Sequence, residues 1–157
     1  MSIEQGLNQD FLDVLETFAN AQVEFLVVGA HAMAVHGVPR ATGDLDLWIH
    51  STAANASRVF AALRAFGAPL EQHGISVADF AAPGTVYQLG LPPRRIDLLT
   101  QISGVSFADA WRSRVEIEIQ NRSVGFLGRE TLLANKRAAA RDKDLVDVKL
   151  LEKSKIP

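Results

Sequence analysis

The chain of 157 residues contains no cysteine. Disulfides, thiolate metal centres and cysteine nucleophiles are therefore excluded, and the composition suits a reducing compartment. No apolar run approaches the roughly 18 residues that a membrane-spanning helix needs. The first ten residues, MSIEQGLNQD, lack the basic and then apolar pattern of a signal peptide. We therefore expect a cytoplasmic protein with no membrane partner.

The chain also lacks a strong net charge. At −2, the formal charge indicates no general attraction for nucleic acid. The charge is nevertheless uneven, because residues 1–50 contain seven acidic side chains and one arginine, whereas residues 129–157 contain eight basic and five acidic ones. The length and the 48% hydrophobic content fit one globular domain. We expect one domain over residues 1–157, with a core over about 10–128 and a helical tail over about 129–154.

The periodicity of apolar residues predicts helices and strands that alternate along the chain. The last 29 residues favour two helices, the second capped at its N-terminus by Asp142. Asn121 and Arg122 are expected to form the turn of a hairpin. The pattern as a whole predicts an α/β or α+β fold, a small mixed sheet flanked by helices. The expected helices cover residues 10–20, 30–37, 52–66 and 106–112, and the expected strands 24–28, 44–50, 85–90, 94–99, 115–120 and 123–128.

The sharpest chemical feature is the tetrapeptide DLDL over residues 44–47. On a strand, Asp44 and Asp46 share one face, while the two leucines point into the core. Carboxylates about 6.6 Å apart along a strand repel each other unless a cation lies between them. Hard divalent ions such as Mg²⁺ prefer these ligands, and pairs of them support phosphoryl chemistry. The alternative is a solvated strand edge, since the pattern is short and common.

Two neighbouring features strengthen the metal interpretation. Gly29 and Ala30 connect a strand to a short helix, where backbone N–H groups can approach a phosphate. Asp97 lies in a second strand-like segment and can supply a third carboxylate beside the first two. The alternatives are an ordinary strand-to-helix turn, and an exposed aspartate paired with Arg94 or Arg95.

Together these segments resemble the DNA polymerase β-type nucleotidyltransferase superfamily. The resemblance rests on FLVVGA (25–30), DLDL (44–47) and IDLL (96–99). The segment HGVPRATGDLDLWI is similar to small bacterial members, with an arginine and a threonine before the first aspartate, here Arg40 and Thr42. Some of those members belong to toxin–antitoxin or phage-defence (abortive-infection) systems. The tail over 135–151 also looks like theirs. Ala30 departs from the family's usual Gly or Ser, which removes one hydroxyl contact to phosphate.

The resemblance implies a role for each matching residue. Asp44, Asp46 and Asp97 would be the catalytic carboxylates and the ligands of two Mg²⁺ ions, which Mn²⁺ can replace. Gly29 and the backbone N–H groups of Ala30 and His31 would hold the β- and γ-phosphates.

Side chains of the preceding loop and of the tail, most of them basic, are expected to supply a further part of the nucleotide site. We expect Arg40 and Thr42 on the preceding loop, and Lys136 and Lys143 on the tail, to contribute to nucleotide binding. The alternative for the lysines is a solvated helix surface, with Lys143 and Asp147 as an ordinary i,i+4 pair.

We therefore expect a Mg²⁺-dependent enzyme that transfers a nucleoside monophosphate from an NTP to a hydroxyl of RNA such as tRNA, of a protein or of a small molecule. The alternative is a catalytically degenerate module that binds nucleotide or acts as an antitoxin. The exposed strands of a small sheet would suit a homodimer or a partner protein.

Overall fold

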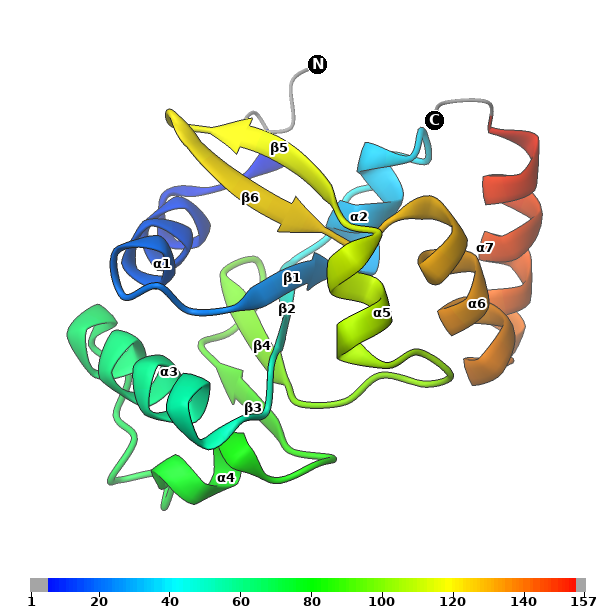
Figure 1. The fold of residues 1–157 in the computed structure, drawn as a ribbon. Coiled ribbons are helices and arrows are strands. Elements are labelled where there is room, and N and C mark those ends of the chain that lie inside the picture. The colour runs from blue at the N-terminus through cyan, green and yellow to red at the C-terminus, as the bar shows by residue number, and fades with distance from the viewer. Residues whose placement is uncertain (1–5, 155–157) are drawn as a thin grey trace.

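The computed structural model describes residues 6–154, which form seven helices and one six-stranded sheet. These elements confirm the expected mixed sheet flanked by helices (Figure 1). In chain order they are α1 (Gln9–Asn20), β1 (Phe25–Val28), α2 (Gly29–Val35), β2 (Asp44–Ile49), α3 (Ala53–Phe66), α4 (Val77–Ala81), β3 (Val86–Leu89), β4 (Arg95–Leu99), α5 (Phe107–Arg112), β5 (Val115–Ile119), β6 (Arg122–Phe126), α6 (Arg129–Ala139) and α7 (Asp142–Lys153).

The strand order β3-β4-β2-β1-β6-β5 places β2 between β1 and β4 at the centre of the sheet. β2 runs antiparallel to β1 and parallel to β4. The parallel register pairs Asp44 with Arg95 and Asp46 with Asp97. Residues paired across neighbouring strands lie on the same face of a sheet, so this register brings four charged side chains together.

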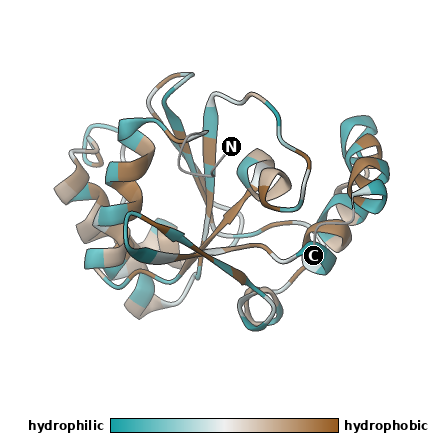
Figure 2. Ribbon diagram, turned by 90° about the horizontal axis from the view of Figure 1, so that it is seen from above, coloured by the Kyte–Doolittle hydropathy of each residue, from teal (hydrophilic) through white to brown (hydrophobic). Residues whose placement is uncertain are grey.

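Each face of the sheet has its own hydrophobic core. On β2, Leu45, Leu47 and Ile49 pack against α1, α3 and α4, whereas Trp48 packs on the other face against α5 to α7. Figure 1 shows these two helix groups on opposite sides of the strands. Figure 2 shows hydrophobic residues concentrated on the central strands, with hydrophilic residues on the outward turns of the helices. The alternation of β2 therefore directs Asp44 and Asp46 toward the side of α6 and α7.

Two details of the chain differ from the expectation. The hairpin turn is formed by Gln120 and Asn121, both with positive φ, and Arg122 already belongs to β6. Asp142 is the first residue of α7 and not its cap. Arg141 is the N-cap, and the carboxylate of Asp144 accepts its backbone N–H. The Asp144 side chain, three residues after the N-cap, thus accepts a backbone N–H at the helix end that Asp142 was expected to cap.

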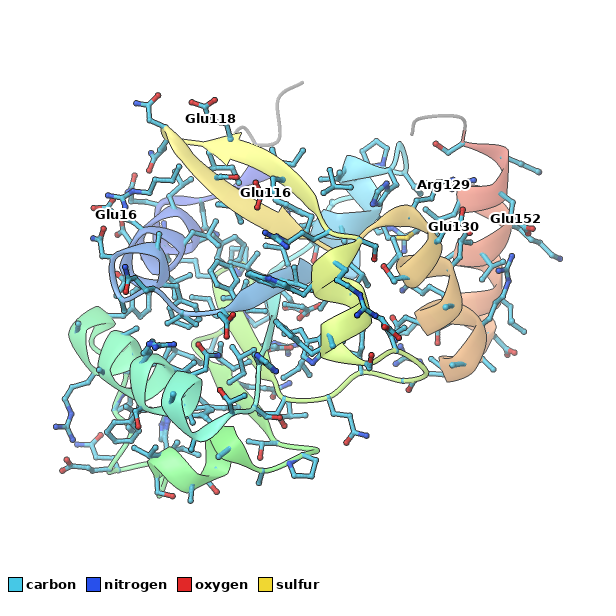
Figure 3. The ribbon with its side chains drawn as sticks, in the orientation of Figure 1. Glu16, Glu116, Glu118, Arg129, Glu130 and Glu152 are labelled. Carbon is cyan, nitrogen blue, oxygen red and sulfur yellow. The ribbon has the colours of Figure 1, made fainter. Side chains whose placement is uncertain are left out.

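Charged side chains line one exposed edge of the sheet. On the edge strand β5, Glu116 and Glu118 are exposed, and Figure 3 shows Glu118 pointing outward near the end of the strand. Charge on an edge strand opposes its pairing with another chain. None of the described helices combines the length and hydrophobicity needed to cross a membrane.

Candidate active site

The centre of the site is the charged face of β2 and β4. Asp44 and Asp46 are half-buried, whereas Asp97 is only 8% exposed. The neighbouring apolar residues Ile96 and Leu98 fill the core on the opposite face, so strand alternation fixes where Asp97 points. The sequence prediction that Asp97 lies beside the Asp44–Asp46 pair is confirmed by the register of the strands.

Arg95 pairs with two of these carboxylates. Its Nη2 donates to Asp44 Oδ2 at 2.8 Å and to Asp97 Oδ2 at 3.3 Å. Its Nε lies 3.1 Å from Asp97 Oδ1, but neither atom has a hydrogen-bond partner among the described residues. One guanidinium therefore neutralises part of the negative charge of the three carboxylates.

Asp46 has no ion pair in the described part of the chain, and its electrostatic environment is unfavourable for a charge. Burial, followed by the negative charges of Asp97 and Asp44, raises the pKa of Asp46 to about 6. Its carboxylate also lies against Gly29, so that a Cβ at residue 29 would collide with Oδ2. Gly29 has a φ of +69°, which most residues avoid. Glycine is therefore needed at this turn both for its backbone conformation and for the space it leaves to Asp46.

A cavity of about 590 Å³ opens in front of Asp44 and Asp46. Its opposite wall comes from the end of α6 and the start of α7. The size is within the usual range for a small-molecule site. The lining residues are Val28, Gly29, Ala30, Met33, Arg40, Thr42, Asp44, Asp46, Leu99, Ile102, Ser103, Asn135, Lys136, Ala139, Arg141, Lys143 and Asp147.

Asp147 of α7 bridges two basic side chains of this cavity, Arg40 and Lys136. Its carboxylate accepts from Arg40 Nη2 at 2.6 Å and lies 3.0 Å from Lys136 Nζ. Burial raises the pKa of Asp147, but the hydrogen bonds from Arg40 and Lys136 outweigh burial and lower it overall. Asp147 thus remains ionised and holds both cations at the cavity.

The fold agrees with that of two proteins of known structure. The lincosamide antibiotic adenylyltransferase LnuA superimposes with a TM-score of 0.59 at 15% identity, covering 96% of this chain and 98% of its own. The nucleotidyltransferase fold is therefore shown for this chain. The antibiotic-resistance factor ANT(2'')-Ia gives a TM-score of 0.55 at 15% identity, covering 96% of this chain and 84% of its own. By sequence, no family model and no curated protein matches the chain.

Within this nucleotidyltransferase fold, most of the expected site residues lie together. Gly29, Ala30, Arg40, Thr42, Asp44, Asp46, Lys136 and Lys143 all line the cavity. His31 does not line it, because its ring is buried and packs edge-on against Phe11. Burial lowers the pKa of His31, and a hydrogen bond with the Asp44 backbone raises it less. A role of the His31 side chain toward a ligand is thus disfavoured, while the backbone role stays a prediction.

The sequence analysis missed three residues of the site or gave them too small a role. Arg141 and Asp147 line the cavity, and Arg95 engages the carboxylates. Arg95 was considered only as an alternative partner for Asp97, and Asp147 only as a helix-surface partner of Lys143. The density of charged residues over 136–147 was the signal that could have indicated these residues. No sequence signal indicated the break at Ala140, which ends α6 and turns α7 back across the cavity.

The donor set fits a divalent cation in its chemistry. Three carboxylates share one face, and the buried Oδ1 of Asp97 has no hydrogen-bond partner among the described residues. Oxygen ligands of this kind suit Mg²⁺. The arrangement is not a ready-made metal site, however. Within residues 6–154, no three His, Asp or Glu side chains are grouped so that they could hold an ion, and Arg95 donates to both Asp44 and Asp97.

Proposed function

We propose that the protein is a Mg²⁺-dependent nucleotidyltransferase that moves a nucleoside monophosphate from an NTP to a hydroxyl group of a small molecule. The cavity carries this proposal, because its two facing walls have opposite charge. Asp44 and Asp46 form one wall, while Arg40, Lys136, Arg141 and Lys143 approach from the other. A triphosphate needs both, namely cations for its oxygens and carboxylates that hold its metal ions.

The residues of the site would act mainly by position and charge. Asp44 and Asp46 would hold Mg²⁺ at the strand and, through it, the triphosphate, with Asp97 as the third carboxylate. Bound Mg²⁺ would supply neutralisation of charge on the attacking and leaving oxygens. Arg40 and Lys136 hold the phosphate oxygens on the opposite wall. The acceptor hydroxyl attacks the α-phosphorus and loses its proton to a base, a new P–O bond forms, and the bond to the β-phosphate oxygen breaks to release pyrophosphate.

A small-molecule acceptor is favoured over RNA or protein. LnuA is an antibiotic adenylyltransferase, and this chain covers 98% of it. The cavity of about 590 Å³ is within the range of small-molecule sites. A macromolecular acceptor, and with it a toxin–antitoxin or defence role, is the other outcome that the following experiment separates.

The test is transfer of label from each of the four NTPs, labelled at the α- or at the γ-phosphate, in the presence of Mg²⁺ and a cell extract. We expect α-label to enter the small-molecule fraction. The Asp44→Asn variant should lose transfer, whereas Asp109→Asn, at an exposed aspartate of α5, should keep it. Label from the γ-phosphate would mean a kinase and would overturn the proposal, and α-label in RNA or protein would overturn the acceptor class.

The second candidate is a degenerate module that binds nucleotide without transferring it. Ala30 favours it, because a hydroxyl that the resembling family supplies is missing here. So does the absence of a ready-made metal cluster in the described residues. Metal-dependent NTP binding without transfer to any fraction of the extract would support this candidate.

A further inference from the structure

The position of Arg95 has a consequence for how the carboxylates take up a metal ion. The guanidinium donates to Oδ2 of Asp44 and to Oδ2 of Asp97, so it occupies one oxygen of each of two carboxylates that a divalent cation would use. A guanidinium has only N–H donors and cannot become a metal ligand itself. A cation bound between Asp44 and Asp97 would therefore compete with the Arg95 guanidinium for these two carboxylates.

We propose that Arg95 is an internal counter-cation that holds Asp44 and Asp97 in the metal-free protein and competes with the divalent cation for them. The inference rests on the proposed function, since it concerns the metal site of that reaction. It assigns Arg95 as a positioning residue.

The contacts of Arg95 are suited to release. Its side chain is 28% exposed, so the guanidinium can turn toward solvent without being left unpaired in the interior. On the Asp97 side the contact is imperfect, because Nε and Oδ1 approach to 3.1 Å without forming a hydrogen bond. The Arg95–Asp44 pair is partly exposed on both sides, at 28% and 30%, and a pair of this kind contributes little to stability, so a doubly charged ion can displace it.

The neighbouring arginine provides a matched control. Arg94 precedes Arg95 directly, has the same charge and is paired with Asp10 of α1 at 3.3 Å. Its side chain is 59% exposed and does not contact Asp44 or Asp97 among the described residues. Replacing Arg94 therefore removes the same charge from the same segment without freeing the carboxylates.

The test is Mn²⁺ binding by isothermal titration calorimetry without nucleotide, at pH 8 and constant salt. Releasing one partly exposed pair should lower the Kd for Mn²⁺ about two- to fivefold in Arg95→Gln. Arg94→Gln should leave the Kd within about 1.5-fold of the wild-type value, because Arg94 is paired with Asp10 and not with the carboxylates. Circular dichroism checks that each variant folds. If Arg95→Gln does not fold, Arg95→Lys serves instead, because a single ammonium cannot bridge both carboxylates, and a smaller gain is expected.

The outcomes separate this inference from the function on which it rests. Unchanged or weaker Mn²⁺ binding in Arg95→Gln, with normal binding in the wild type, would overturn the role of Arg95 and leave the proposed function intact. An equal gain in Arg94→Gln would also overturn it, since general charge would then be the cause. Wild-type protein that binds no Mn²⁺, or binds it equally after Asp44→Asn, would overturn the metal site itself.

Discussion

Replacing Asp46 by asparagine should stabilise the metal-free protein. Burial, followed by the charges of Asp97 and Asp44, raises the pKa of Asp46 to about 6 from its ordinary value of 3.8. A carboxyl whose pKa is raised by folding binds its proton more tightly in the folded state. The folded state therefore loses stability as the pH rises from about 3.8 to about 6, and the penalty is constant above that range. Asparagine has no charge and avoids the penalty.

The magnitude follows from the same pKa values. A carboxyl that titrates near 6 instead of 3.8 carries a penalty of about 3 kcal/mol at pH 8. Asp46 is only half-buried and water screens part of this, so we expect a gain of about 1–2 kcal/mol for Asp46→Asn. Asp44→Asn should give no such gain, because Asp44 is paired with Arg95 at 2.8 Å.

The assay is urea unfolding in EDTA between pH 4 and pH 8, with the difference between variant and wild type as the measured quantity. The difference should be close to zero near pH 4 and reach its full value above about pH 7. Saturating Mg²⁺ should reverse its sign, since a metal that binds the folded wild type stabilises it. A variant that is no more stable than the wild type in EDTA, or a gain that does not depend on pH, would refute the reasoning.

Three further substitutions, one of them a control, test the surroundings of the carboxylates. Gly29→Ala should displace the Asp46 carboxylate and reduce label transfer at least about a hundredfold, the scale of a misplaced reacting group. Gly74→Ala, with the same φ of +69° but open space around its Cβ, should lose only about 1 kcal/mol of stability and keep activity. Asp147→Asn should cost about 1–3 kcal/mol and raise the KM for NTP by freeing Arg40 and Lys136, which urea unfolding and initial rates would measure. That loss should disappear as the pH falls below about 3.8, because the folded state lowers the pKa of Asp147.

Local pattern was enough to predict the elements of this fold and the strand that carries the two aspartates. The alternation D-L-D-L determines which side chains share a face, and the structure bears this out, with Leu45 and Leu47 in the core. The third carboxylate could also be placed, since Ile96 and Leu98 flank Asp97 in the same alternating way. Periodicity of two residues is short-range information, and it does not depend on the rest of the fold.

Contacts across the fold could not be predicted in this way. The Arg40–Asp147 bond joins residues 107 positions apart, and it depends on the break at Ala140 that brings α7 over the cavity. Ala140 has a φ of +54°, a conformation that alanine seldom adopts. No glycine or asparagine stands at this position to indicate the turn in the sequence. The expectation of Asp142 as the cap failed for the related reason that Arg141 and Asp144 share that task.

The position of Arg95 explains why the sequence supports two opposite views of Asp97. In the alternative interpretation, Asp97 is an exposed strand residue paired with Arg94 or Arg95, and Arg95 lies two residues away on the same strand face. The structure contains that pair, and on the same face it also contains the three carboxylates that we propose hold the metal. The two views exclude each other only if the pair is permanent. Because Arg95 is partly exposed, we propose that the ion pair and the metal site are alternative states of one group of side chains. The affinity for the divalent cation, with and without the guanidinium, then decides which state the cell contains.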